Sequence, residues 1–243
     1  RAWRQLRTLA VWKRVSPVKY YLTGQDKVFG AESPPRKKYL FLIIPNYTNA
    51  ALFWGFGLHG GQFAPQLRIR YLMPSLLFCI PLLRDLLMWS GAVGYPQGDK
   101  WNTVNDLLNR GYSVAYACNG MSDVHTVHKQ SIEVQVPVDA KFQYAKQEGV
   151  SIVPVLVNGE RDRYVFAPQP SLIARVQRYC QTRWGYIPLV YLIRRKQQLH
   201  LQFCTIIQPH LYDTAAALKI EFMSVIKSAN TGTGGPDKSI TFI

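Results

Sequence analysis

The hydrophobic and polar positions between residues 39 and 61 follow a clear order. Residues 39–44, YLFLII, form an uninterrupted apolar run with the length of a buried strand. Residues 45–49 are more polar and contain proline and asparagine, which favour a turn. Residues 50–56 are again mostly apolar and predict a helix packed on a sheet, followed by a glycine-rich bend. A turn at the carboxyl end of a strand is a common place for chemistry in α/β enzymes, so this turn is the first candidate site.

The rest of the chain alternates between strand-like and helix-like patterns. Apolar or alternating runs predict strands, and runs with helical spacing, several followed by glycine, predict helices. The expected strands are residues 92–95, 112–118, 132–136, 150–157, 187–193 and 199–207, and the expected helices are residues 81–89, 101–109, 140–147, 172–180 and 214–228. This order predicts a single α/β domain whose mostly parallel sheet is flanked by helices on both faces.

One apolar segment, residues 72–88, does not fit a single element. It contains two prolines and an Arg-Asp pair, and the chain has no run of 18 or more uncharged apolar residues, so no membrane-spanning helix is predicted. The segment could pack on the sheet or lie in a membrane interface. We expect packing on the sheet.

Charge narrows the choice of partners. The chain has 29 Lys+Arg against 14 Asp+Glu, a net charge of +15, which favours nucleic acid, anionic lipid headgroups or acidic proteins as neighbours. Residues 1–25 contain six basic residues and no acidic one, namely Arg1, Arg4, Arg7, Lys13, Arg14 and Lys19. An Arg-rich, amphipathic, acid-free segment is typical of a mitochondrial transit segment or of the mature end after it. The alternative is a basic surface helix of a cytosolic protein.

These patterns divide the chain into three parts. We expect a basic N-terminal helix and linker over residues 1–38, the α/β domain over residues 39–229, and a flexible Gly-rich tail over residues 230–243. We also expect the protein to be mitochondrial and associated with the inner membrane, because a basic amphipathic helix suits a membrane surface.

The sequence does not predict a cofactor or a metal site. The four cysteines, Cys79, Cys118, Cys180 and Cys204, are far apart and are expected to be free, mostly buried thiols of a reducing compartment. His125 and His128 could join Asp123 or Cys118 as metal ligands, but no second ligand pair with matching spacing accompanies them. The glycines near residue 233 lack the flanking strand and helix of a phosphate loop.

Several short strings resemble the diacylglycerol/monoacylglycerol acyltransferase family. Residues 80–92 are similar to its Pro-x-Leu-Arg-Asp/Glu-x-Leu-Met-x-x-Gly string, and residues 149–155 to its Gly-Ala-x-x-Val-Pro-Val strand. Residues 158–160 stand where the family has Phe-Gly-Glu, and residues 184–188 resemble its Gly-x-x-Pro segment. The resemblance implies an acyltransferase-like fold and, in active members, acyl transfer from acyl-CoA to an acylglycerol hydroxyl. The base of that family is a histidine in a His-Pro-His-Gly turn after the first core strand.

The chain departs from the family where the chemistry should be. The histidine turn corresponds to Ile44, Pro45, Asn46 and Tyr47, so only its proline remains. Isoleucine cannot take a proton, and an asparagine amide is not a base at neutral pH. Residues 118–122 lack the carboxylate of the family's Gly-Gly-x-x-Glu stretch, and residues 138–141 differ in charge and shape from its Arg-Lys-Gly-Phe segment. The resemblance therefore implies a degenerate member without a catalytic residue in this turn.

Two alternatives stay open. His59, beside glycines 60 and 61, is a weaker candidate for a catalytic base, although it lies beyond the expected helix and not on the turn. Arginines near Tyr179 and Trp184, and at residues 161–163 and 194–196, could bind phosphates or single-stranded RNA, but equally suit lipid headgroups or acidic subunits.

We therefore expect a catalytically inactive acyltransferase homologue. Its role would be that of a structural accessory subunit of a mitochondrial membrane protein complex, for example in the respiratory chain. Its partners would be other protein subunits and anionic phospholipid, and it could hold a lipid in the former acyl groove. The first alternative is an active, divergent lipid O-acyltransferase that uses His59, and the second is an RNA-associated subunit of a mitochondrial ribosome.

Overall fold

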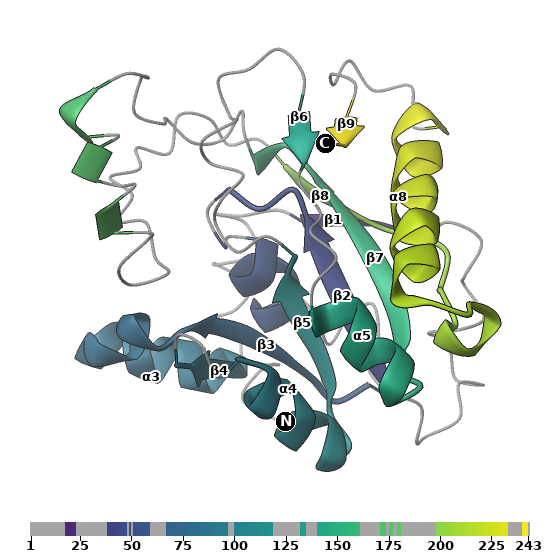
Figure 1. Cartoon of the computed structure of the whole chain (residues 1–243). Helices are drawn as coiled ribbons and strands as arrows, with labels where there is room; N and C mark the ends of the chain where they lie inside the picture. Colours follow the sequence, from purple (N-terminus) through teal and green to yellow (C-terminus); the bar gives the residue numbers. More distant parts are fainter. Residues whose placement is uncertain are drawn as a thin grey trace.

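A seven-stranded sheet forms the centre of the molecule (Figure 1). The computed structural model describes residues 18–22, 38–47, 49, 51–58, 67–96, 100–118, 132–134, 140–160, 171–173, 175–176, 179–180, 198–232 and 240–242. The strands are, in spatial order, β1 (Val18–Leu22), β8 (Leu199–Phe203), β7 (Ser151–Asn158), β2 (Tyr39–Ile44), β5 (Ser113–Ala117), β3 (Ile69–Pro74) and β4 (Ala92–Tyr95). Every neighbouring pair is parallel except β7 and β8. The predicted α/β fold with a mostly parallel sheet is therefore confirmed.

Strand β2 is the most enclosed element of the sheet. It lies between β7 and β5, and all six of its residues are buried. Alternate side chains point to opposite faces, so Leu40, Leu42 and Ile44 enter one hydrophobic cluster and Tyr39, Phe41 and Ile43 enter another. A strand covered on both faces needs apolar residues at every position, which explains the uninterrupted run in the sequence.

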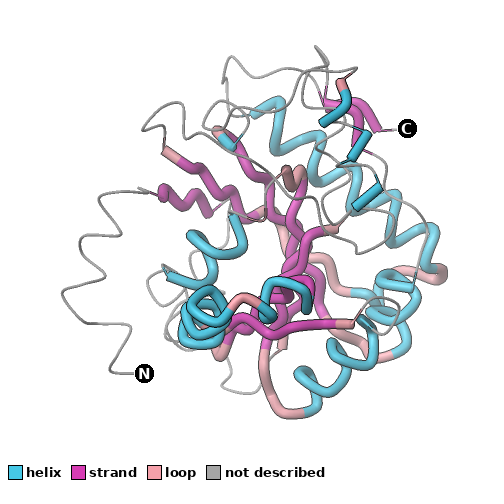
Figure 2. The backbone as a smooth tube through the Cα atoms, turned by 90° about the vertical axis from the view of Figure 1, so that its left-hand side faces the viewer, coloured by secondary structure: helices cyan, strands magenta, loops and turns pink. Residues whose placement is uncertain are grey.

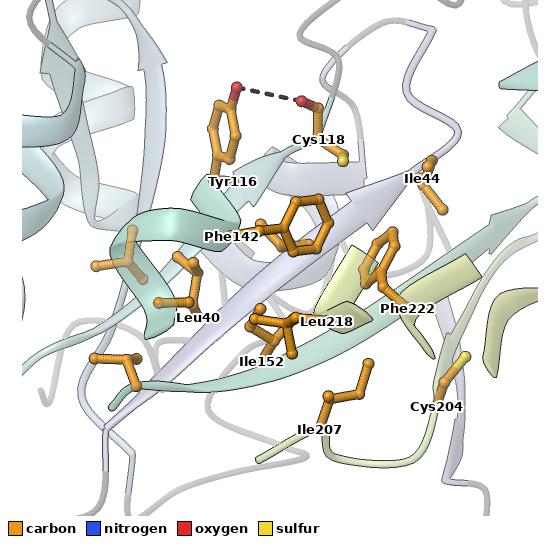
Figure 3. Close-up of a cluster of buried hydrophobic side chains, with 14 of the residues drawn as sticks. Leu40, Ile44, Tyr116, Cys118, Phe142, Ile152, Cys204, Ile207, Leu218 and Phe222 are labelled. Carbon is orange, nitrogen blue, oxygen red and sulfur yellow. Dashed lines mark hydrogen bonds between the residues drawn. The ribbon is translucent and has the colours of Figure 1, made fainter. Parts of the chain in front are cut away.

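Helices cover both faces of the sheet, as expected. On the first face lie α4 (Lys100–Asn109), α5 (Ala140–Gln147) and α8 (Ala215–Gly232), which bury side chains such as Phe142, Leu218 and Phe222 against β2 and β7 (Figure 3). On the second face lie the π-helix η2 (Ala51–Leu58), the 3-10 helix η3 (Ser75–Cys79) and α3 (Pro81–Ser90). Figure 2 shows the helices distributed around the strands. None of the helices in the described ranges is long and apolar enough to cross a bilayer.

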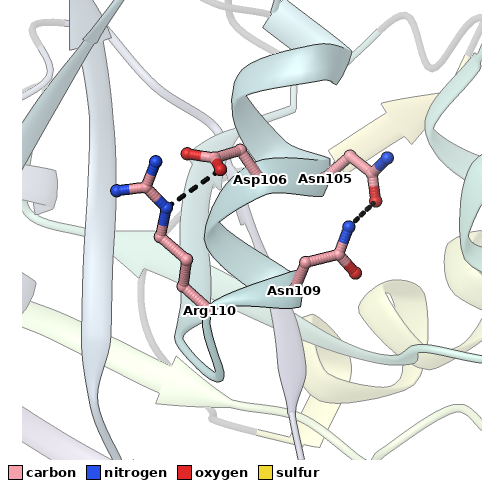
Figure 4. Close-up of polar contacts among 4 residues, drawn as sticks. All are labelled: Asn105, Asp106, Asn109 and Arg110. Carbon is pink, nitrogen blue, oxygen red and sulfur yellow. Dashed lines mark hydrogen bonds and ion pairs between the residues drawn. The ribbon is translucent and has the colours of Figure 1, made fainter.

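The exposed side of α4 carries contacts one helical turn apart. Asp106 accepts a hydrogen bond from Arg110 Nε at 2.9 Å, and Asn105 accepts one from Asn109 Nδ2 at 3.2 Å (Figure 4). Residues at i and i+4 are neighbours on a helix surface, so such pairs support the helix locally. The opposite side of α4 buries Val104, Leu107 and Leu108 in the first core cluster.

The structure adds two strands to the central sheet that the sequence pattern did not reveal. Val18–Leu22 forms β1 at one edge of the sheet, so the sheet begins upstream of the expected boundary at residue 39. Ile69–Pro74 forms β3, and residues 72–88 are thus the end of a strand followed by η3 and α3. Arg70 and Pro74 interrupt the apolar pattern of this strand.

At the other end of the chain, α8 continues to Gly232, and β9 (Ile240–Phe242) pairs in parallel with β6 (Ile132–Val134). The expected strand over residues 187–193 and the helix expected near the N-terminus lie outside the described residues. The division of the chain into three parts stays a prediction.

Candidate functional site

The candidate turn lies at the carboxyl end of β2, between the ends of β5 and β7. Ile44 is the last residue of β2, and its peptide bond to Pro45 is cis. Asn46 and Tyr47 are buried although they follow the strand. Cys118 N donates to Ile43 O at 2.9 Å, which places the end of β5 directly beside the end of β2. The four residues that the sequence singled out are thus brought together at the predicted edge of the sheet.

Asn46 and Asn49 hold the turn through two side-chain hydrogen bonds. Asn46 Nδ2 donates to Asn49 Oδ1 at 2.9 Å, and Asn49 N donates to Asn46 Oδ1 at 3.1 Å. Asn49 has a φ of 59°, a left-handed conformation that asparagine tolerates better than most residues. Its carbonyl then accepts from Phe53 N at 3.2 Å, which leads the chain into η2. Both the nitrogen and the oxygen of the Asn46 amide make hydrogen bonds within the turn, and neither can act as a base.

A buried carboxylate connects this turn to the end of β7. Tyr47 N donates to Glu160 Oε2 at 3.0 Å, and both residues are almost completely buried. Glu160 follows Gly159, whose φ of 87° allows the chain to leave β7 sharply. A buried hydrogen bond between a backbone N–H and a side-chain oxygen satisfies both groups, so this contact holds the turn against the end of the neighbouring strand.

A buried ammonium lies at the end of β5. Lys141, on α5, is fully buried, and its Nζ donates to Cys118 O at 3.1 Å. The hydroxyl of Tyr116 donates to the same carbonyl at 3.4 Å (Figure 3). The hydrogen bond from Lys141 ties the first turn of α5 to the end of β5, and the one from Tyr116 stays within the end of β5. The side chain of Lys141 also lies 5.7 Å from the ring centre of Phe142.

A second ammonium is surrounded by aromatic rings at the start of α4. Lys100 Nζ donates to the hydroxyl of Tyr116 and lies 4.3 Å from its ring centre. The rings of Tyr95 and Trp101 are 5.8 and 5.9 Å away. Aromatic faces attract cations, so this cluster of rings stabilises the positive charge. Burial raises the pKa of Tyr95, which keeps its hydroxyl neutral.

The remaining sequence candidates cannot be placed in the same way. His59, His125, His128, Asp123 and the basic stretches 161–163, 183–184 and 194–196 lie outside the described residues. The described residues contain no group of three or more His, Cys, Asp or Glu side chains that could hold a metal ion. The four cysteines are free, and all but Cys79 are buried, as expected.

Lys141 and Glu160 are the site residues that sequence reasoning missed. Lys141 lies next to Phe142 and about one turn before Ala145, on the buried side of α5. A lysine on the apolar side of a predicted helix indicates a buried ammonium group. Glu160 follows the turn that closes a fully buried strand, where a parallel sheet gathers polar side chains. The sequence pattern therefore indicated that Lys141 and Glu160 occupy special positions, but it did not indicate which atoms they contact.

Comparisons with known proteins agree on the type of fold. No protein-family model matches the chain. The chain is 25% identical over 174 residues to diacylglycerol O-acyltransferase 2 of Dictyostelium discoideum. That match covers 69% of this chain and 52% of the relative, so the chain spans about half the length of the curated protein it resembles.

A solved structure extends the likeness over most of the chain. The 1-acyl-sn-glycerophosphate acyltransferase PlsC of Thermotoga maritima superposes with a TM-score of 0.53 at 11% identity, covering 90% of this chain and 74% of that one. At this identity the likeness concerns the fold alone. The sequence match and the shared architecture together support an acyltransferase-like protein with weak sequence similarity to diacylglycerol O-acyltransferase 2.

Proposed function

We propose that this protein is a catalytically inactive acyltransferase homologue that serves as a structural accessory subunit of a mitochondrial membrane protein complex. The observation that carries the proposal is the Asn46–Asn49 pair at the end of β2, where two reciprocal hydrogen bonds hold an amide in a buried turn. In the family that the sequence resembles, this turn provides a histidine base. An amide cannot accept the hydroxyl proton that acyl transfer must remove.

The surroundings of the turn support the same interpretation. Tyr47 stands where the family has glycine, and its side chain is buried, so it fills space beside the strand end. The nearby Glu160 carboxylate holds the backbone of Tyr47 and is thereby engaged in shaping the turn. The Lys141 ammonium is likewise engaged with the carbonyl of Cys118. The polar groups of this edge act as a scaffold, and the fold is retained for packing and not for turnover.

The membrane and subunit roles rest on charge and on the N-terminal pattern. The net charge of +15 suits anionic phospholipid and acidic subunits, and the basic, acid-free first 25 residues suit a mitochondrial protein. A lipid retained in the former acyl groove would add a further link to the membrane. Lipid extraction and mass spectrometry of the purified protein would detect such a molecule.

An acyl-transfer assay tests the catalytic part. The full chain should transfer no acyl group from oleoyl-CoA to diacylglycerol, monoacylglycerol or lysophosphatidate above a protein-free control, while an active diacylglycerol acyltransferase serves as positive control. Turnover by the wild-type chain would overturn the proposal. Turnover that disappears in His59→Ala but persists in His210→Ala, an exposed histidine in η5 (Pro209–Leu211), would establish the divergent enzyme instead.

Affinity purification from native membranes tests the partners. We expect co-purification of inner-membrane protein subunits, identified by mass spectrometry, in amounts that high salt and nuclease leave unchanged. Nuclease-sensitive recovery of ribosomal proteins would instead support the RNA-associated alternative, whose phosphate contacts should weaken steeply with salt.

A further inference from the structure

Exposed hydrophobic side chains gather on two segments of the described chain. Eleven large hydrophobic residues are exposed among the described residues, and eight of them belong to η3–α3 or to the segment 171–180. The first four are Leu76, Ile80, Leu82 and Met88, and the second four are Leu172, Ile173, Val176 and Tyr179. We call these sets the α3 surface and the 171–180 surface. In Figure 1 the backbone of α3 lies at the lower left and the described parts of 171–180 at the upper left, both away from α8.

The described residues of the 171–180 surface are exposed apolar side chains with helical spacing. Its apolar members follow the spacing i, i+1, i+4 and i+7, which places them along one side of a helical segment. Leu172 is 75% exposed, so this side is not packed on the sheet, whereas Cys180 at the end of the segment is buried. Arg175 is also exposed beside the apolar side chains. An apolar stripe flanked by arginine is the arrangement that binds at a lipid headgroup boundary.

The α3 surface is apolar and carries little net charge. Leu82 is 86% exposed, the highest value among the exposed hydrophobic residues, and it lies in the first turn of α3. The charged residues of this helix, Arg84 and Asp85, are exposed and form an ion pair of 3.1 Å with each other. The pair leaves no excess charge next to Leu82. The other side of α3 buries Leu87 in the core, so the exposed leucine is not needed to hold the helix in place.

We propose that this side of the molecule docks on a lipid bilayer that contains anionic phospholipid. The net charge of +15 favours an anionic surface, and Arg175 places positive charge at the 171–180 surface. Leu82 and Leu172 protrude, and a fluid bilayer accepts protruding aliphatic groups without preformed pockets. This inference rests on the proposed membrane location, and it assigns the contact to two folded surfaces of the chain.

Vesicle co-sedimentation tests the docking surface with the full chain. The vesicles contain phosphatidylcholine alone or with about one third phosphatidylglycerol. The decisive variant is Leu82→Glu with Leu172→Glu. The matched control is Leu211→Glu with Ile220→Glu, which adds the same charge at exposed apolar positions of η5 and α8, outside both surfaces. Circular dichroism confirms that each variant is folded.

We expect the wild-type chain to bind the anionic vesicles at least about tenfold more tightly than neutral ones. The decisive variant should lose at least about tenfold in affinity, while the control stays within about threefold of wild type. Equal losses in both variants, no binding by the wild type, or equal binding to neutral vesicles would each overturn the proposal. Self-association without lipid that the decisive variant abolishes, with vesicle binding unchanged, would assign the surface to a protein interface.

The outcome is separable from that of the proposed function. Vesicle binding requires no acyl transfer, so a chain that binds through these surfaces and also consumes oleoyl-CoA would overturn the inactive-homologue proposal and leave the docking surface intact. A chain with neither activity nor vesicle binding would overturn the docking surface alone.

Discussion

The carboxylate of Glu160 accepts a hydrogen bond from the backbone N–H of Tyr47, although the two residues are 113 positions apart. The contact joins the end of β7 to the turn after β2 in a buried setting. A buried polar side chain in this position needs hydrogen-bond partners, because burying it without them is costly. The turn and the end of β7 therefore depend on each other.

Replacing Glu160 with glutamine should lower the free energy of unfolding by about 1–3 kcal/mol. Glutamine keeps the shape of the side chain but changes the acceptor of the buried hydrogen bond from Tyr47 N, and weakening a buried hydrogen bond costs stability. The matched control is Asp106→Asn, on the exposed side of α4, where loss of the ion pair to Arg110 should cost no more than about 0.5 kcal/mol. Urea unfolding of both variants measures the difference. Equal, small losses would show that Glu160 does not hold the turn.

Replacing Lys141 with methionine should also destabilise the fold, by about 1–3 kcal/mol. Methionine keeps the length of the side chain but removes the donor to Cys118 O at the end of β5. The control is Lys19→Met, an exposed lysine of β1. Chemical denaturation checks the effect. An unchanged or higher stability of Lys141→Met would mean that the cost of burying the ammonium outweighs its hydrogen bonds.

The parts of the fold that the sequence predicted are those whose pattern is local. The run 39–44 is apolar at every position because both faces of β2 are covered. The helices that contain Val104 and Phe142 show the helical spacing of apolar residues in the sequence itself. Strand β3 was missed because its Arg70 and Pro74 interrupt the apolar pattern. Strand β1 was missed because it is short and follows a basic segment with helical spacing. Both gain their hydrogen bonds from distant strands, which a local pattern does not report.

The sequence predicted where the candidate site lies, but not which residues contact each other there. Proline and asparagine located the turn at Pro45 and Asn46, since turn chemistry is read from a few adjacent residues. The contact between Tyr47 and Glu160 depends on how β2 and β7 are paired, and that between Lys141 and Cys118 on how α5 packs beside β5. Such contacts depend on which strands and helices are neighbours in space, and only the structure shows this.

Gly159 and Gly111 offer a matched test of backbone strain. Both have positive φ, 87° and 80°. An added Cβ at Gly159 would lie 2.5 Å from the backbone oxygen of Gln198, whereas at Gly111 it would meet nothing within 4 Å. Gly111→Ala should cost about 1–2 kcal/mol, the penalty of the left-handed conformation, and Gly159→Ala at least about 1 kcal/mol more. Thermal and urea unfolding compare the two. Equal costs would contradict a close approach of Gln198.

The cysteines should differ sharply in reactivity. Cys79 is exposed, whereas burial raises the pKa of the Cys204 thiol to about 12. At pH 8 only about one Cys204 in ten thousand would be a thiolate, which is the reactive form. Iodoacetamide should therefore label Cys79 in the folded protein and Cys204 only after denaturation, as read by peptide mass spectrometry. Labelling of Cys204 in the folded Cys79→Ser variant would show that the interior opens more readily than the structure indicates.

Stability should fall at alkaline pH for the same physical reason. Burial raises the pKa of the Cys204 thiol and of the Tyr144 phenol to about 12, with repulsion by Glu148 as a second cause for Tyr144, and burial also raises the pKa of Tyr20. Between the unfolded values, 9.0 for cysteine and 10.0 for tyrosine, and the folded ones, the folded state holds more protons than the unfolded state. The contribution of these groups to the free energy of unfolding is then fully present below about pH 9 and declines as the pH rises further. Urea titrations at a series of pH values, with tyrosinate absorbance recorded in parallel, measure the decline. Tyr20→Phe removes one of these groups and should flatten the slope above pH 10, whereas a stability that rises over this range would contradict the burial of these groups.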